Sequence, residues 1–152
     1  MRTLDVRIDI EVDRPTSEVF DFVADQTNAP LWQRGLAGVQ RMTPPPVGVG
    51  TEHVFERRFA GMTIESRNRY TAYEPGRFVA FEIPSGKMTG HASYLVEPSG
   101  ANSSRLASEM HFSFTGAAAL FTPLLARMLE RDGKKNLATL RDLLERTHAN
   151  PQ

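Results

Sequence analysis

The hydrophobic period of this chain changes after Gly116 and stays changed almost to the end of the sequence. From there the apolar residues recur every three or four positions: Phe121, Leu125, Leu129, Leu137, Leu140 and Leu144. This spacing predicts one long amphipathic helix, and Pro123 fits its first turn, where proline is tolerated. Because one side of such a helix is apolar, the rest of the chain must supply a surface for it to cover.

The chain before Gly116 supplies that surface mostly as strands. Residues 4–12 alternate between apolar and charged side chains, which predicts a strand with one face in water. Pro15 and Thr16 then begin a helical pattern over 16–25, and a turn or short helical stub follows at 27–32. Six further strands, separated by turn residues, are predicted at 36–42, 51–59, 62–72, 77–83, 89–97 and 104–114.

These elements predict an α+β fold. A curved seven-stranded antiparallel sheet wraps on the long C-terminal helix, with two short helices after the first strand, because short consecutive hairpins make neighbouring strands antiparallel. We expect a single domain over residues 1–147 and a tail at 148–152. A curved sheet with one helix across its concave side leaves space between the two layers.

Composition narrows the classes of partner. The 18 basic and 18 acidic side chains cancel, so the whole chain has no net field to attract nucleic acid or anionic lipid. Cysteine is absent, no apolar run reaches the roughly 18 residues of a membrane span, and the first residues lack the apolar core of a signal peptide. We therefore expect a cytoplasmic protein that does not span a membrane.

Neither a metal nor a cofactor is expected. His53 is the one histidine that the strand phases turn inward, whereas His91 and His111 point outward and His148 lies in the tail, so the imidazoles do not converge on a metal. The Gly-Val-Gly stretch at 48–50 leads into a strand rather than a helix, unlike a phosphate-binding or dinucleotide-binding loop.

The strand phases place a mixture of apolar, aromatic and polar side chains on the inner face. Leaving such polar groups buried and unpaired costs roughly 1–3 kcal/mol each, so several of them indicate water or a ligand between the layers. The candidate ligand-binding residues are Trp32, His53, Phe55, Arg57, Ser66, Asn68, Tyr70, Phe81, Tyr94, Ser108, Met110, Phe112, Leu125 and Leu129. In the alternative interpretation these polar groups pair with one another or end in solvent, and a bulge turns Arg57 outward.

Four stretches, taken in their order along the chain, carry a family resemblance: "VDRPTSEVFDFVADQTNAPLW", "PVGVGTEHVFERRF", "RYTAYEPGRFVAFE" and "NLATLRDLLE". They resemble the START and Bet v 1-like (SRPBCC) superfamily, and within it the small bacterial polyketide cyclase/dehydrase-like group. The resemblance implies the helix-grip fold, with a cavity between sheet and helix that takes hydrophobic or aromatic small molecules. It also implies that Trp32 stands at one end of this cavity, where its ring lines the pocket, seals the core, or does both.

We expect a protein that binds a hydrophobic or aromatic small molecule, such as a lipid, polyketide or quinone, as a monomer or weak homodimer. One alternative is a polyketide cyclase or dehydratase whose candidate catalytic residues are Arg57, His53 and Tyr70. In that case Arg57 stabilises an enolate, and His53 or Tyr70 moves a proton. A second alternative is a regulatory interaction module that uses the exposed sheet face or the loop "TPPPVG". The sequence leaves these interpretations open, because the same groups serve a carrier and an enzyme.

Overall fold

The structure is a computed structural model that describes residues 2–59, 61–83 and 88–149. Its strands are β1 (Arg2–Val12), β2 (Leu36–Arg41), β3 (Glu52–Phe59), β4 (Met62–Glu74), β5 (Phe78–Ile83), β6 (Met88–Gly100) and β7 (Ser103–Phe114). Its helices are α1 (Thr16–Ala24) and α2 (Thr122–Ala149), with the short 3-10 helices η1 (Gln26–Leu31) and η2 (Gly116–Phe121). The predicted order of elements is confirmed.

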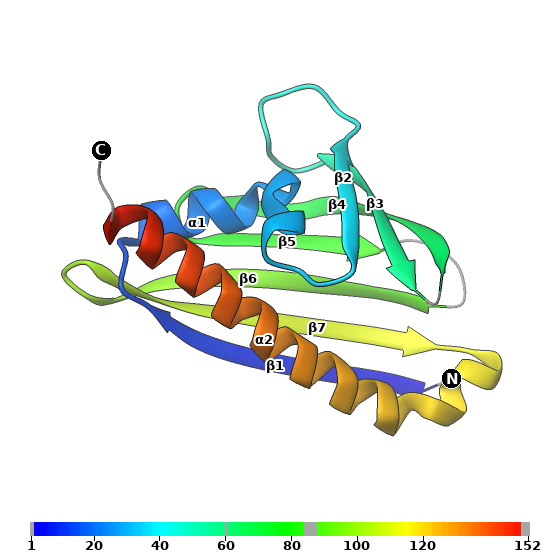
Figure 1. Ribbon diagram of the computed structural model, residues 1–152. Helices are drawn as coiled ribbons and strands as arrows, with labels where there is room; N and C mark the ends of the chain where they lie inside the picture. The colour runs from blue at the N-terminus through cyan, green and yellow to red at the C-terminus, as the bar shows by residue number, and fades with distance from the viewer. Residues whose placement is uncertain (1, 60, 84–87, 150–152) are drawn as a thin grey trace.

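The strands form one antiparallel sheet in the order β1-β7-β6-β5-β4-β3-β2. Figure 1 shows α2 running diagonally across one face of this sheet, with α1 and η1 on the same side. This arrangement confirms the curved sheet with a long C-terminal helix across it. No helix in the described part of the chain is long and apolar enough to cross a membrane.

The core lies between the sheet and the helices, and the predicted strand phases mostly hold. In β1, Leu4, Val6, Ile8 and Val12 are buried while the charged residues between them are exposed. The inner faces of β6 and β7 are also as predicted, with the following residues buried: Ala92, Tyr94, Val96, Leu106, Ser108, Phe112 and Phe114. The burial of alternate residues follows from the pleat, which points successive side chains to opposite faces.

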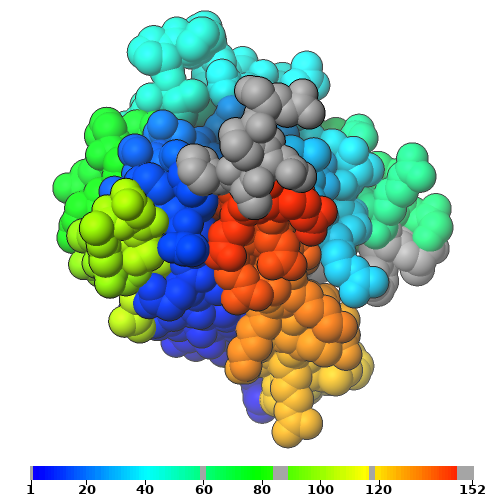
Figure 2. Space-filling model, turned by 60° about the vertical axis from the view of Figure 1, so that its left-hand side comes forward, coloured from blue at the N-terminus to red at the C-terminus, as the bar shows by residue number. Residues whose placement is uncertain are grey.

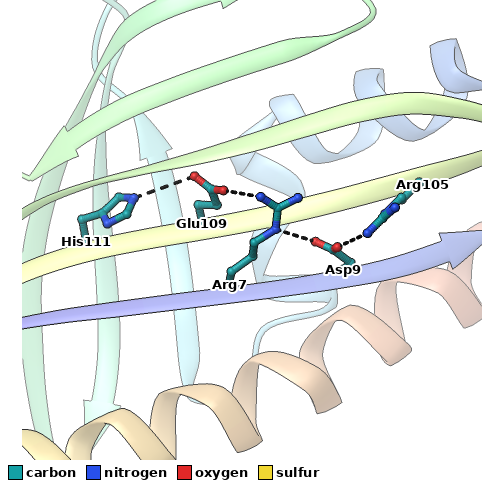
Figure 3. A network of polar contacts seen from close by, with 5 residues as sticks. All are labelled: Arg7, Asp9, Arg105, Glu109 and His111. Atoms are coloured by element: carbon teal, nitrogen blue, oxygen red, sulfur yellow. Dashed lines mark hydrogen bonds and ion pairs between the residues drawn. The ribbon is translucent and has the colours of Figure 1, made fainter.

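The outer face of the sheet carries a row of charged side chains (Figure 3). Arg7 joins Glu109 at 2.8 Å and Asp9 at 3.2 Å, and Arg105 donates a hydrogen bond to the other oxygen of Asp9. The hydrogen bond from Arg105 is the main cause that lowers the pKa of the Asp9 carboxyl. His111 continues the row, because its Nε2 lies 3.8 Å from Glu109. The predicted outward orientation of this histidine is confirmed.

Two local features depart from the regular patterns. Alternation from Tyr70 would turn Ala72 inward, but a bulge in β4 after Tyr70 adds a residue, so Tyr73 packs against the core instead. Phe121, which the helical spacing placed on the covered stripe, belongs to η2 and is 58% exposed. A 3-10 turn rotates residues by a different angle from an α-helix, so the stripe of α2 does not extend into it.

The strand registers bring distant segments to one end of the sheet, called here the η2 end. Phe114, the last residue of β7, pairs with Arg2 on one side and with Met88 on the other. The turn between β3 and β4, where Phe59 pairs with Met62, extends in the same direction. The start of α2 and the β3–β4 turn therefore lie at the same end of the molecule.

Candidate ligand-binding cavity

A cavity of about 380 Å³ lies between the inner face of the sheet and α2. The predicted site residues that line it are Trp32, Phe55, Arg57, Ser66, Asn68, Phe81, Tyr94, Ser108, Met110, Phe112 and Leu129. Alternate positions of β3 and β4 contribute Phe55 and Arg57, and Ser66 and Asn68, because successive inward positions of a strand are two residues apart. The volume and the mixed lining are typical of a small-molecule site.

Arg57 presents a cation to this cavity. Its Nη2 donates a hydrogen bond to Gln33 Oε1 at 3.3 Å, and its guanidinium carbon lies 5.8 Å from the centre of the Phe55 ring. Arg57 is an exposed residue at the edge of the cavity, and nearby protein atoms partly desolvate its guanidinium and lower its pKa, an effect that Tyr94 partly opposes. Arginine stays protonated in proteins, so the cavity contains a fixed positive charge. Within the described ranges, no carboxylate forms an ion pair with it.

Tyr94 and Trp32 form an aromatic corner of the same cavity. Their ring centroids are 6.2 Å apart with an interplanar angle of 69°, an edge-to-face contact. Burial raises the pKa of the Tyr94 phenol to about 12, and the charge of Arg57 limits that rise. The phenol is therefore protonated at neutral pH and can donate a hydrogen bond to a ligand oxygen.

A second polar site on the cavity wall joins η1 to the sheet. Asn68 Nδ2 on β4 donates to Gln26 Oε1 at 2.5 Å, and both residues are buried. Sequence reasoning missed Gln26, although it lies in the same segment as Trp32. Only the packing of η1 shows that this amide turns inward, because a short 3-10 helix has no long hydrophobic period to read.

His53, Tyr70 and Leu125 do not line the cavity, which corrects their expected placement. Tyr70 is 1% exposed and its hydroxyl donates to the Ala24 carbonyl at 2.5 Å, so it holds α1 to the sheet. His53 is also 1% exposed, and its ring lies 5.3 Å from that of Tyr70. Both residues do point inward, as their strand phase predicted, but toward the end of the core filled by α1 and η1. Leu125 packs against the core from α2.

Further lining residues come from outside the strands. Gln33 and Arg34 follow η1, and Asp132, Gly133 and Asn136 lie on the cavity side of α2. The backbone N–H of Arg34 donates to Asn136 Oδ1 at 3.2 Å, which links the segment after Trp32 to the helix. The apolar repeat after Gly116 predicted the helix that carries the positions on α2, whereas no periodic signal marked Gln33 or Arg34.

A shallow depression of about 930 Å³ lies on the outer face of the sheet, lined by outward-facing residues that include His91 and His111. The centroids of these rings lie 5.0 Å apart with an interplanar angle of 35°, but the depression is open to solvent and not enclosed between layers. Among the residues whose placement is described, no three His, Cys, Asp or Glu side chains cluster closely enough to hold a metal ion.

Comparison with known proteins agrees with this architecture. The model of the family described as "Polyketide cyclase / dehydrase and lipid transport" matches residues 3–145. No curated protein matches the chain.

Solved structures share the fold at low sequence identity. The Zhui aromatase/cyclase from Streptomyces sp. R1128 has a TM-score of 0.79 at 15% identity, covering 95% of each chain. A START superfamily protein from Mycobacterium smegmatis has a TM-score of 0.78 at 11% identity, covering 94% of this chain and 98% of its own. A protein from Thermobifida fusca has a TM-score of 0.70 at 22% identity, covering 96% and 95%. The predicted helix-grip fold is confirmed.

Proposed function

Because the chain belongs to the polyketide cyclase/dehydrase and lipid-transport family, within the START and Bet v 1-like superfamily, we propose that it binds a hydrophobic or aromatic small molecule bearing an anionic or carbonyl oxygen. The apolar part of this ligand occupies the cavity between the sheet and α2, and its oxygen binds Arg57. The observation that carries the proposal is that the Arg57 guanidinium lines a partly enclosed cavity and has no carboxylate partner in the described chain.

Partial desolvation of the Arg57 guanidinium favours a ligand that carries an oxygen acceptor. The Arg57 side chain stays exposed, but neighbouring protein atoms displace part of its hydration, and its hydrogen bond to Gln33 replaces little of what is lost. A ligand oxygen accepting from Arg57 makes a hydrogen bond to a charged group, worth about 1.5–3 kcal/mol. The Tyr94 hydroxyl supplies a second donor from the neighbouring wall of the cavity. The cavity therefore favours amphipathic ligands over pure hydrocarbons.

Binding of anilinonaphthalene sulfonate, an aromatic anion, tests this proposal. We expect the wild-type protein to bind it and Arg57→Gln to bind it about tenfold more weakly, since one charged hydrogen bond is lost. Arg58→Gln is the matched control, because Arg58 is the next residue, is exposed and does not line the cavity. Circular dichroism verifies that each variant is folded.

Two results would contradict the proposal in different ways. Equal affinities for the wild type and Arg57→Gln would show that the anion does not bind at Arg57. Failure of the wild type to bind this probe, together with a native mass spectrum free of any adduct, would show that the cavity holds no ligand of this class.

A second candidate function is a cyclase or dehydratase reaction in the same cavity. The pair of Arg57 and Tyr94 favours it, because a cation and a protonated phenol can together polarise a ligand carbonyl. Neither His53 nor Tyr70 lines the cavity, so Asp132, the carboxylate on its wall, replaces them as the candidate proton acceptor. A Tyr94→Phe variant distinguishes the two functions, since turnover of a reactive polyketone would decrease while binding of the aromatic anion persists.

A further inference from the structure

Apolar side chains protrude from the protein where α2 begins. Leu120, Phe121 and Leu124 are 74%, 58% and 58% exposed, and together they are called here the apolar tip. Figure 2 shows the yellow and orange residues of this region projecting from the body of the molecule. A projecting apolar group cannot be covered by the chain that carries it, so burial requires another surface.

Basic residues follow the apolar tip on the exposed side of α2. Arg127, Arg131, Lys134 and Lys135 are all exposed and are called here the basic collar. Residues 122–136 contain these four basic residues against two acidic ones, whereas residues 137–146 contain two of each. Glu130 pairs with Lys134, and Asp132 pairs with Arg131. Arg127 and Lys135 form no ion pair within the described chain, so two positive charges remain for a partner.

The sheet adds a second apolar group at the same end. Met62 and Ile64, at the start of β4, are 65% and 45% exposed. Ile64 pairs across the strands with Arg57, which lines the cavity. The η2 end therefore has exposed apolar residues both on the helix and on the sheet, next to the residues that line the cavity.

We propose that the η2 end docks on the surface of an anionic lipid bilayer, with the apolar tip inserted among the acyl chains and the basic collar against the headgroups. Exposed apolar residues next to a basic helical face are the combination that binds such surfaces. The projecting shape of the apolar tip favours insertion into a bilayer over binding in a protein groove. A second copy of the chain, seated tip to tip, is disfavoured because it would bring the two basic collars together. The whole chain has no net charge, which predicted no attraction to anionic lipid. That sum does not show the local excess of positive charge in the basic collar.

Co-sedimentation with vesicles tests the docking surface on the full chain. We expect binding to vesicles of phosphatidylcholine containing roughly one-third phosphatidylglycerol, weak binding to phosphatidylcholine alone, and release by salt. The variant Leu120→Ser/Phe121→Ser/Leu124→Ser should reduce the bound fraction about fivefold or more. Arg127→Gln/Lys135→Gln should weaken binding about tenfold on anionic vesicles alone.

Val49→Ser is the matched control, because Val49 is 70% exposed but lies in the β2–β3 connection, away from α2. This control should bind vesicles as the wild type does. The proposal is overturned if the wild type does not sediment with anionic vesicles, if Val49→Ser loses binding as the triple variant does, or if the triple variant changes only the oligomeric state in solution. The variant Arg57→Gln alters the cavity but keeps the apolar tip and the basic collar intact. Its binding to vesicles therefore tests the docking surface separately from the proposed cavity ligand.

Discussion

At the scale of single residues, polar atoms without partners gather behind the cavity wall. Both ring nitrogens of His53, Asn68 Oδ1 and Arg41 Nε are buried and form no hydrogen bond within the described structure. Burial, followed by the charge of Arg41, lowers the pKa of His53, while Asp25 and Asn68 act in the opposite direction. The fold therefore keeps this imidazole neutral, in contact with the rings of Tyr70 and Phe55.

His53 makes stability depend on pH in a predictable direction. The unfolded chain takes up the proton first as the pH falls below the ordinary value of 6.5, because the folded-state pKa is lower. The free energy of unfolding should therefore be highest above this pH and decrease below it, by up to about 1.4 kcal/mol per pH unit. Urea denaturation of His53→Leu at a series of pH values should show a shallower decrease between neutral pH and the range where carboxylates titrate.

The exposed His91 supplies the control for this experiment. His91→Gln should keep the wild-type pH dependence, because His91 lies on the outer face of the sheet. An unchanged acid slope in His53→Leu would contradict the assignment of the effect to His53.

At the scale of elements, the packing of α2 on β1 limits the volume of the cavity. Gly133 lies inside the helix, where glycine costs about 1 kcal/mol relative to alanine. A Cβ atom there would lie 2.4 Å from Cδ1 of Ile8, and both residues line the cavity. The missing side chain therefore accommodates Ile8 and keeps space open next to it.

Side chains at position 133 should reduce ligand affinity more than stability. Gly133→Ala should change the free energy of unfolding by less than about 1 kcal/mol, since the gain in helix propensity offsets a rotation of Ile8. Gly133→Leu should weaken binding of anilinonaphthalene sulfonate about tenfold by filling the cavity. Thr139→Leu, on the exposed side of the same helix, is the control and should bind normally. Wild-type affinity in Gly133→Leu would show that the ligand does not occupy this region.

At the scale of the whole molecule, the sheet, η1 and α2 meet around one reporter residue. Trp32 is 5% exposed, it is the sole tryptophan of the chain, and its ring contacts Tyr94 on the cavity wall. It closes one end of the core and also lines the cavity. Emission from this protein therefore arises from the boundary between the core and the site.

Binding of decanoate, an apolar carboxylate without a chromophore, should change the intensity or the wavelength of this emission. The physical reason is that an acyl chain in the cavity changes the packing and hydration around the Trp32 ring. Fluorescence titration measures the change, isothermal calorimetry measures binding independently, and Trp32→Phe supplies the background. Binding detected by calorimetry without any change in emission would place the ligand away from Trp32.

The sequence by itself determined the elements, their order and most strand phases. Alternation in β1 and the repeat in α2 are local patterns, and a residue's own neighbours decide which face it occupies. These phases were sufficient to predict a little under half of the cavity-lining residues, Arg57, Tyr94 and Ser108 among them. The family resemblance, carried by motifs of the same kind, is confirmed.

Tertiary structure alone decided which inward residues meet the cavity and which meet other side chains. Tyr70 and His53 share the predicted face with Asn68, yet α1 and η1 cover them, whereas Gln26 and Gln33 reach the cavity from segments without a period. The exposure of Phe121 and the bulge after Tyr70 likewise depend on where one element ends against another. The physical reason is that periodicity specifies which way a side chain points from the backbone. Whether that side chain meets a cavity or other packed side chains depends on contacts between residues distant in sequence.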